Sequence, residues 1–552
     1  MGRLKWVLVF CICGFVTFGQ NHSATKVDDK KSENLASLAK VWGFLKYYHP
    51  NVAKGNFNWD EQLIQMIPKV EQAQNKDDLS RIYLEWIAAL GVVKECKSCK
   101  ETSKEKSFDK NFDLSWINNS IIFTNELSHK LKYIEENRFR GENYYVNKSS
   151  VGNIKVINEI NYTYFDYPDQ NHRLLSLFRY WNTVEYFFPY KYLTDQNWDS
   201  VLIEMIPKFK NANDALEYQL LMQETVVKLD DTHASFYSDK NFDFFGRKYI
   251  PAFINVIEDK VVIAGFYNDS LAKLNDIKKG DIIEEVDGKS ALEIMSERKK
   301  YVNGSNNNTK AKNYDYFIFN GSTDSVKVKI RRDNLIFVKT IKRYSGIDFQ
   351  PKGLYNKEKF NVDQNNIAYI NLDNLEMKDQ NIIMQKINKT KGLIIDFRNY
   401  PDFMPYLIAR RLIKEDKEYA RLIEPDLTFP GKFNWKKTKV LDPIKNEYYA
   451  GKVVVLVNEE TQSMAEYCTM FLQTGDNVVT IGSQTAGADG DISRIEFLTF
   501  KSAISGLGVF YPDGTPTQRV GVKVDILVRP TIKGIQEGRD ELLEKAKEYL
   551  AK

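Results

Sequence analysis

A serine and a histidine that lie far apart in the chain carry its clearest chemical signal. Ser463 stands in the stretch N-E-E-T-Q-S-M-A-E-Y, and His233 stands in K-L-D-D-T-H-A-S. A serine hydroxyl becomes an effective nucleophile when a neighbouring base takes its proton at neutral pH, and histidine is the usual base. The chain has five histidines, so the candidate bases can be compared one by one.

The comparison favours His233. It follows the apolar run 218–229 and the double acid Asp230-Asp231, so it lies in a charge-rich turn after an expected helix. Such a turn can present a catalytic base, although an ordinary surface histidine would fit it as well. His49 lies in a segment whose second copy has Phe188 at the same place, which indicates a structural role. The others lie near the N-terminus or in polar, loop-like sequence: His22, His129 and His172.

Ser463 is predicted to begin a helix directly after a strand and a short turn. Lys452–Val457 reads K-V-V-V-L-V, which is typical of a strand buried on both faces of a parallel sheet. The residues after Ser463 have apolar side chains at the spacing of one helical face. These are Met464, Tyr467, Cys468, Phe471 and Leu472.

This position supports two interpretations. Ser463-x-x-Glu466 is a capping box, which needs no chemistry to explain it. A helix N-terminus also offers free N–H groups and a partial positive charge, so the Met464 N–H would stabilise an oxyanion formed at Ser463. Loss of one such donor typically costs about 3–4 kcal/mol of barrier. The spacing alone does not decide between the two.

Four segments, in this order, resemble the tail-specific (C-terminal processing) serine peptidase family. L-D-D-T-H is similar to the histidine motif of its tricorn-like branch, and G-D-I-I-E-E-V-D-G at 280–288 resembles the core of a PDZ domain. G-L-I-I-D-F-R-N-Y at 392–400 resembles the Asp-x-Arg end of a strand. The last segment is S-M-A-E with I-G-S-Q-T-A-G-A at 481–488. The resemblance runs from about residue 170 to the end.

The resemblance implies a multidomain α/β protein with a crotonase/ClpP-like α/β peptidase core. The expected order is a signal peptide at 1–19, an N-terminal helical domain with short strands at 20–165, a helical part of the peptidase unit at 166–245, a PDZ-like β-rich domain at 246–345 and the catalytic domain at 346–552. No cofactor and no metal are expected.

The family has two catalytic arrangements, and one of them is excluded. A Ser/Lys dyad needs a lysine about two dozen residues after the serine, but none lies between Ser463 and Lys501. The tricorn-like branch uses serine and histidine instead, and a serine commonly precedes its histidine. Here that position is Thr232, which keeps a hydroxyl.

Two further positions depart from the family pattern. Gln518 stands where the resemblance implies a glutamate, in the stretch Q-R-V-G-V-K-V-D-I. An amide can orient an imidazole but cannot stabilise imidazolium by charge, so Asp231 is a second candidate for that role. The loop 399–403, which should supply the second oxyanion donor, has no glycine. A backbone N–H of Asp402 or Phe403 is the expected donor there.

Composition and the N-terminus narrow the setting. The net charge is +4 on 78 basic and 74 acidic residues, with no basic block, so nucleic-acid binding is not favoured. M-G-R-L-K followed by an apolar run to Gly19 fits a secretory signal peptide. Phe10 and Ile12 precede the two cysteines of that run, which disfavours a lipoprotein. We expect a protein secreted across the inner membrane, periplasmic or associated with the cell envelope, that does not span the membrane.

Cysteines give one local prediction. Cys96 and Cys99 can close a small disulfide in an oxidising compartment. A zinc site would need two more ligands nearby, and a redox role would need a thioredoxin-like setting, neither of which is evident. Cys468 falls on the apolar helix face and is predicted to lie in the core.

An internal repeat governs the N-terminal half. Residues 41–69 match 180–208 without a gap. Each copy predicts an aromatic-faced helix, a loop with a proline and a second helix stopped by Pro68 or Pro207. The second copy leads to His233, whereas the first reads as a duplicated appendage. Between the copies, 118–162 predicts a few short strands.

The rest of the chain predicts two kinds of sheet. Residues 249–344 alternate as strands, with a turn at 332–334 and an asparagine-rich loop at 303–308. A PDZ-like domain there would accept an extended peptide at a sheet edge, such as a substrate C-terminus, unless it is only a spacer. From Asn365 onward strands and helices alternate, which predicts a parallel α/β sheet. The strands are Ile367–Leu372, Gly392–Phe397, Lys452–Val457 and Val478–Ile481; the helices are Gln380–Asn388, Met404–Leu412, one from Met464 and Glu541–Leu550.

The combined prediction is a serine endopeptidase acting on polypeptides through Ser463 and His233. Two alternatives stay open. Gln518 and the glycine-free loop also fit a catalytically inactive peptide-binding scaffold of the same fold. The aromatic content, 13% of residues, would fit a carbohydrate-binding envelope protein, although no paired carboxylates or sugar platform accompany it.

Overall fold

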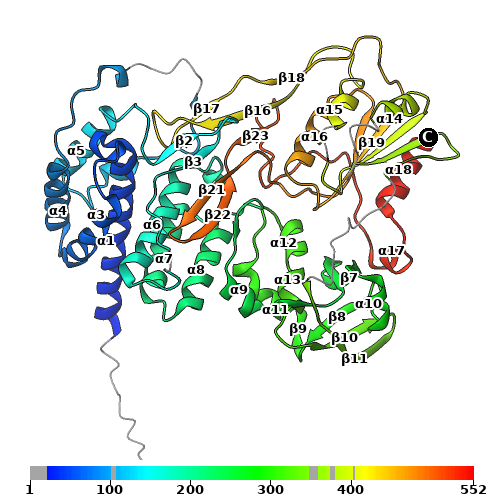
Figure 1. The fold of residues 1–552 in the computed structure, drawn as a ribbon, viewed down its shortest axis with the longest axis horizontal. Helices are drawn as coiled ribbons and strands as arrows, with labels where there is room; N and C mark the ends of the chain where they lie inside the picture. Colours follow the sequence, from blue (N-terminus) through cyan, green and yellow to red (C-terminus); the bar gives the residue numbers. More distant parts are fainter. Residues whose placement is uncertain (1–20, 101–106, 164, 347–358, 373–379, 402–403) are drawn as a thin grey trace, which may run out of the picture.

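The computed structural model describes residues 21–100, 107–163, 165–346, 359–372, 380–401 and 404–552 (Figure 1). The predicted signal peptide at 1–19 and the predicted oxyanion donors Asp402 and Phe403 lie outside these residues. None of the helices within the described ranges is both long enough and apolar enough to cross a bilayer.

Helices make up the N-terminal half of the molecule, at one end of Figure 1. The first group is α1 (Asn21–Tyr48), α2 (Pro50–Ala53), α3 (Trp59–Gln72), α4 (Lys76–Ala89) and α5 (Asn125–Glu136). The second group is α6 (Gln170–Phe187), α7 (Trp198–Asn211) and α8 (Ala215–Val227).

The two matching segments form the same pair of helices with the same contacts. The Trp42 indole N–H donates to the Trp59 carbonyl at 2.9 Å, and the Trp59 indole donates back to the Trp42 carbonyl at 3.1 Å. Trp181 and Trp198 exchange the same two bonds at 2.9 and 3.1 Å. Each pair fixes one helix against the next, which explains the matching tryptophans.

The predicted stop at the two prolines is wrong. Pro68 lies inside α3 and Pro207 lies inside α7. A proline removes one helical hydrogen bond. The side chains that follow it, Val70 and Phe209, are nevertheless completely buried, so packing of the apolar face holds the last turn of each helix.

The segment between the copies also differs from the prediction. Besides the short strands β2 (Val146–Lys148) and β3 (Ile154–Val156), it forms α5. The signal was present in Thr124, which caps the helix, and in a buried helical stripe. His129 and His172 therefore lie in helices, α5 and α6, and not in loops.

Both helix groups share one hydrophobic core, which also takes in Ile423 and Phe497 from later strands. Ion pairs cross this core. Arg179 on α6 pairs with Asp60 on α3 and reaches Glu159 at 3.4 Å, and it is 4% exposed. The first copy is therefore packed against the second, not suspended from it.

Arg179→Met tests this connection. It would leave the buried carboxylate of Asp60 without its cation, whereas Glu159 keeps its pair with Lys46. We therefore expect the free energy of unfolding to fall by about 3–5 kcal/mol. Urea unfolding followed by circular dichroism measures the change. The matched control is Arg81→Met, because Arg81 is 62% exposed and its pairs should contribute less than about 1 kcal/mol. Equal urea midpoints for the two variants would contradict the prediction.

Residues 248–345 form a separate antiparallel unit with its own core. The sheet order is β11-β10-β8-β7-β6, from β6 (Ala252–Ile257), β7 (Lys260–Phe266), β8 (Ile282–Val286), β10 (Ser325–Arg332) and β11 (Leu335–Lys342). The helices are α10 (Asp269–Leu274), α11 (Ala291–Arg298), α12 (Asn307–Asn313) and α13 (Asp315–Phe319). The predicted loop 303–308 thus ends early, because Asn306 caps α12.

The predicted parallel α/β sheet is confirmed. Its order is β13-β14-β15-β19-β20-β24, and only β13 (Phe360–Val362) is antiparallel. The parallel strands are β14 (Ile367–Asn371), β15 (Gly392–Asp396), β19 (Lys452–Val457), β20 (Val478–Gly482) and β24 (Ile526–Leu527). The helices are α14 (Gln380–Ile387), α15 (Met404–Ala409), α16 (Met464–Leu472), α17 (Ile532–Gln536) and α18 (Glu541–Ala551). Separate cores lie on its two faces, which explains the continuous apolar strands.

Smaller sheets join these units. One is β1 (Ser107–Phe108), β17 (Phe433–Trp435), β16 (Lys417–Pro425) and β18 (Lys439–Leu441), with β23 (Gly508–Phe510) paired to β16. The other contains β21 (Ile492–Phe497), β22 (Phe500–Ser505) and β4 (Ser235–Phe236). Ser235 pairs with Ala503, so the turn that carries His233 is held against the end of β22.

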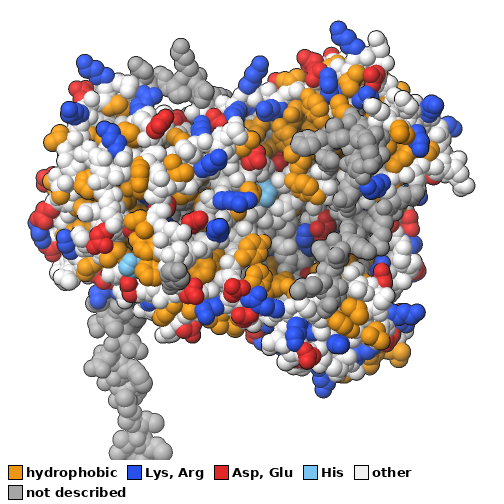
Figure 2. Space-filling view, viewed as in Figure 1, with side chains coloured by type: hydrophobic (Ala, Val, Ile, Leu, Met, Phe, Trp, Pro, Cys, Tyr) orange, Lys and Arg blue, Asp and Glu red, His pale blue; other side chains and the backbone are white. Residues whose placement is uncertain are grey.

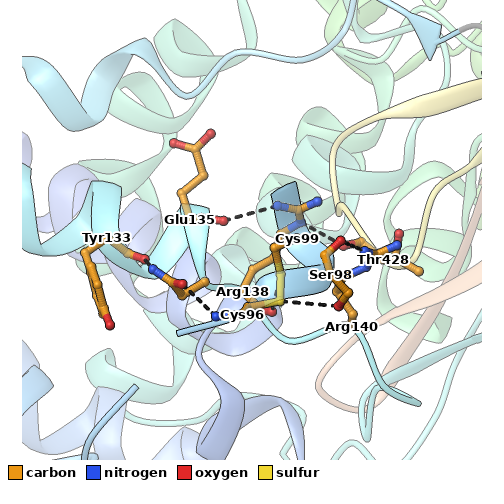
Figure 3. The surroundings of a disulfide bond; sticks show 9 residues. Cys96, Ser98, Cys99, Tyr133, Glu135, Arg138, Arg140 and Thr428 are labelled. Atoms are coloured by element: carbon orange, nitrogen blue, oxygen red, sulfur yellow. Dashed lines mark hydrogen bonds between the residues drawn. A yellow bond between two sulfur atoms is a disulfide. The ribbon is translucent and has the colours of Figure 1, made fainter. Parts of the chain in front are cut away.

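Cys96 and Cys99 form a disulfide (Figure 3). The Cys96 N–H donates to the Asn137 side chain at 2.8 Å, and Arg138 donates to the Thr428 carbonyl at 2.9 Å. The disulfide turn is thereby attached to the end of α5 and, through Arg138, to the loop before β17. Cys468 is free and buried, as predicted.

Candidate active site

Ser463 is the N-cap of α16 and has a left-handed backbone, with φ of 57°. This conformation is uncommon for a residue with a side chain and typically costs about 1–3 kcal/mol. A sharp strand–turn–helix of this kind presents a nucleophile at the end of a sheet. The Ser463 N–H donates to the Ala488 carbonyl at 2.9 Å, which holds the turn in place.

Glu466 fixes the loop that follows β20 to the start of α16. Its buried carboxylate accepts the Thr485 hydroxyl and the N–H groups of Gly487 at 2.8 Å, Ala488 at 3.0 Å and Ser463 at 3.3 Å. Burial raises the pKa of Glu466 to about 7, and these hydrogen bonds oppose that rise. The glutamate predicted as half of a capping box thus also anchors the loop 485–488.

The same loop reaches the turn that carries His233. The Thr232 hydroxyl donates to the Ala486 carbonyl at 3.0 Å, and Ser463 donates to the Ala488 carbonyl. Two residues of chain span at most about 7 Å, so the serine and histidine segments meet on one short loop. The described residues include no hydrogen bond between Ser463 and His233, and such bonds are often longer before a substrate binds.

His233 is held by a serine and an aspartate. Its Nδ1 lies 2.9 Å from the Ser505 hydroxyl, which donates to Asp231 at 2.9 Å. A hydroxyl has one proton, and a carboxylate only accepts. Ser505 therefore accepts from Nδ1–H of His233, and the lone pair of the imidazole stays on Nε2, the tautomer that a general base needs.

Burial lowers the pKa of His233, while Asp231 and Asp491 act in the opposite direction. The imidazole is consequently neutral at pH 7 and able to take a proton. Asp231 itself is 1% exposed and also accepts the backbone N–H groups of Ser505 at 2.7 Å and His233 at 3.1 Å. The other acid of the pair, Asp230, instead binds Lys310 at 2.7 Å.

Gln518 and Thr232 lie in the same cluster, but each contacts a group other than the His233 ring. Gln518 is buried and donates to Asp231 at 3.1 Å. The Thr232 hydroxyl, whose proton goes to the Ala486 carbonyl, accepts from Ser305, whose hydroxyl oxygen lies 2.9 Å away. The carboxylate linked to the His233 ring is therefore that of Asp231. The link is the hydroxyl of Ser505, which the sequence did not indicate. No local motif marks Ser505, because its role depends on the pairing of β4 with β22.

Comparison with models of known protein families identifies one domain of the chain. Residues 366–528, which contain Ser463 and the parallel sheet, match the model of peptidase family S41. The chain therefore contains a domain of peptidase family S41, which supports its recognition as a tail-specific peptidase. It is accordingly a serine-type peptidase, a hydrolase.

Solved structures share the fold of this S41 peptidase at low identity. Mature CPAF in complex with lactacystin is 12% identical, with a TM-score of 0.52 over 69% of this chain and 97% of that chain. Mature CPAF alone is 14% identical, with the same TM-score over 69% and 96%. A putative peptidase from Parabacteroides merdae is 15% identical, with a TM-score of 0.44 over 70% and 98%. No curated protein matches the sequence significantly.

The Asp-x-Arg segment of the S41 peptidase has a structural role. Arg398 binds Asp396 at 2.7 Å and Asp540, at the start of α18, at 2.8 Å. The Thr461 hydroxyl donates to the Phe397 carbonyl at 2.9 Å, so the end of β15 is joined to the turn before Ser463. Met464 N–H lies at the first position of α16, where N–H groups lack a helical acceptor.

Within the described ranges, no cluster of three or more His, Cys, Asp or Glu side chains is arranged to hold a metal ion. Acidic and basic side chains are interspersed over the face drawn in Figure 2.

Proposed function

We propose that the chain is a secreted serine endopeptidase of the Ser/His type, with Ser463 as nucleophile and His233 as general base. The observation that carries the proposal is the anchoring of both segments to the loop 485–488, together with the Nδ1 proton held by Ser505. The tautomer fixed by Ser505 leaves Nε2 free to act as the base.

In the proposed reaction Nε2 of His233 takes the proton of the Ser463 hydroxyl as its oxygen attacks the substrate carbonyl. The Met464 N–H stabilises the negative oxygen of the tetrahedral intermediate. Nε2 then gives its proton to the leaving amine, and an acyl-enzyme remains on Ser463. Water, activated by the same imidazole, hydrolyses that ester. Asp231 stabilises imidazolium through Ser505 in both steps.

A small fluorophosphonate probe tests the assignment. Ser463 should be labelled in the wild-type protein, and labelling should be lost in His233→Ala, as shown by peptide mass spectrometry. Labelling of Ser463 at the same rate in both proteins would refute the role of His233. Absence of labelling with a correctly folded wild-type protein would favour the inactive scaffold.

The antiparallel unit is proposed to be a PDZ-like domain that presents substrate. β6 is an edge strand of its sheet, and edge strands are where extended peptides add. A peptide added there would have to displace the side chains of Asp315 and Asn255, which bind the N–H groups of Ile254 and Val256 at 2.8 Å each. A cavity of about 710 Å³ lies beside it, lined by Phe253 and Asn255 of β6 and by Asn458 and Glu459 of the S41 domain. Presentation of a substrate C-terminus along this edge would bring the polypeptide toward Ser463.

The proposed location is the periplasm or cell envelope. The basic start and apolar run at the N-terminus support secretion. The disulfide between Cys96 and Cys99 supports an oxidising compartment, since cytosolic thiols are kept reduced.

The pH dependence follows from the histidine. Because burial lowers the pKa of His233 below its ordinary 6.5, the neutral base persists into mildly acidic solution. We expect the acid limb of the kcat/KM profile to have its midpoint below pH 6.5. Hydrolysis of a peptide measured from pH 4 to 9 gives the profile. A limb near pH 7 that disappears in Glu466→Gln would instead belong to Glu466, whose pKa is about 7.

A further inference from the structure

A cavity of about 520 Å³ opens beside the proposed catalytic base. His233 and Gln462, the residue before Ser463, line one part of it. Further lining comes from the segment after His233, from α9 (Asp239–Phe245) and from α8, α12 and α13. In Figure 1, α9 lies between α8 and α13. We call this space the aromatic cavity.

Aromatic rings that contact one another form part of the wall of the aromatic cavity. Tyr237 stacks on Phe242 with centroids 6.1 Å apart, and Phe242 meets Tyr316 edge-on at 6.1 Å. Phe245 meets Tyr301 at 5.4 Å. Edge-to-face and offset contacts of this kind fix ring positions, so the wall is formed before any ligand arrives.

The lining carries almost no charge. Among the residues that line the cavity, Lys312 carries a full charge at neutral pH, and it is paired with Glu460 at 2.7 Å. His233 is neutral. A carboxylate that entered would lose hydration without gaining an unpaired cation, which is unfavourable. An apolar side chain would bury its surface against the rings.

Two polar atoms of this lining lack a hydrogen-bond partner among the described residues, the Tyr316 hydroxyl and the Asn241 side-chain oxygen. Asn241 is 5% exposed, and its side-chain amide donates to Gln223 at 2.7 Å. Its oxygen Oδ1 is buried and accepts no hydrogen bond from any described residue. A buried amide acceptor without a donor is costly, and the edge of a tyrosine or tryptophan ring carries the donor that it lacks.

We propose that the aromatic cavity binds a tyrosine or tryptophan side chain of the polypeptide substrate, within about two residues of the bond that Ser463 attacks, since an extended chain advances about 3.3–3.6 Å per residue. The inference rests on the proposed function and adds its substrate preference. The rings hold the aromatic body. Asn241 Oδ1, which is buried in the free protein, accepts from the indole N–H or the phenol O–H once its side chain turns toward the cavity.

Matched peptides test the preference. A peptide series carries tryptophan, alanine or glutamate at successive positions around one cleaved bond, and kcat/KM is measured by liquid chromatography and mass spectrometry. Wild-type protein should cleave the best tryptophan peptide at least tenfold faster than its alanine counterpart, with glutamate poorest. Phe242→Ala and Tyr237→Ala should reduce the tryptophan preference at least fivefold. Tyr237 is 67% exposed, so its replacement should leave the fold intact.

The control is Phe244→Ala. Phe244 lies on the same helix, is 53% exposed and does not line the cavity, so this variant should keep the full preference. Equal cleavage of all three peptides by wild-type protein, or an equal loss of preference in Phe244→Ala, would overturn the inference.

A binding measurement separates this inference from the proposed function. The Ser463→Ala protein is titrated with the tryptophan and alanine peptides, and binding is followed by calorimetry. Tighter binding of the tryptophan peptide that is lost with added Phe242→Ala supports the cavity even if no cleavage is ever seen. Equal binding of both peptides by a protein whose Ser463 is labelled by fluorophosphonate rejects the cavity and leaves the peptidase proposal standing.

Discussion

Ser463→Ala is expected to lower kcat for peptide cleavage by about a million-fold, to the level left by binding and oxyanion stabilisation alone. The reason is that Ser463 is the strained residue at the N-terminus of α16, whereas the other hydroxyl of that turn, on Thr461, is buried and bound to the Phe397 carbonyl. Cleavage of an unfolded polypeptide, followed by mass spectrometry of the products, measures the loss. Urea unfolding should be nearly unchanged, because the side chain is only half-buried.

The double variant with His233→Ala sharpens this prediction. Residues that act as one unit are not additive, so removal of both should cost about as much as removal of Ser463 alone. Cleavage by the Ser463→Ala protein at the wild-type rate would refute the proposal that Ser463 is the nucleophile. A further large fall in the double variant would show that His233 acts elsewhere.

Asp231→Asn is expected to reduce kcat by about ten-thousand-fold, the size of effect seen when the partner carboxylate of a catalytic histidine becomes an amide. An amide in this place can donate to Ser505, which then donates to Nδ1 and moves the imidazole proton to Nε2. The base would be present in the wrong tautomer. Alkaline pH should not restore activity, because charge on the ring is not the defect.

Ser505→Ala separates the relay from simple packing. Without the hydroxyl the His233 ring loses its link to Asp231, so kcat should fall strongly while KM for a matched peptide changes little. Thr232→Val is the matched control, because its hydroxyl contacts Ser305 and Ala486 and not the ring. A larger loss of kcat in Thr232→Val than in Ser505→Ala would assign the orienting role to the threonine.

Gln518 needs a different interpretation from the one that its position in the sequence favours. The family pattern implies a glutamate there, but the Gln518 amide donates to Asp231, which already supplies a carboxylate. Gln518→Glu would place two acids about 3 Å apart, where both cannot be ionised. The amide is thus compatible with an active peptidase and does not by itself favour the inactive scaffold.

The catalytic sheet was predictable because its strands are buried on both faces. Such strands need apolar side chains along their buried length, as in residues 453–457 of β19 and 393–395 of β15. The helix after Ser463 was equally plain from its spacing. Patterns of this kind predict a strand or a helix from the local sequence alone, without knowledge of the rest of the fold.

Long-range partners could not be predicted in the same way. Ser505 meets His233 only because a two-residue strand, β4, pairs with the end of β22. Neither segment carries a pattern that specifies the other. The prediction that helices stop at Pro68 and Pro207 was wrong for a related reason. Burial against residues distant in the sequence outweighed the low helix propensity of proline.

The shared core of the two helix groups has a consequence for anyone shortening this protein. A gene trimmed to begin at the second copy would bare the surface that α1 and α3 now cover, including the side of Asn182 that donates to the Ala39 carbonyl. An exposed apolar surface of that size would favour self-association and precipitation. The N-terminal third should therefore be retained in any expression design, even for work that concerns only hydrolysis.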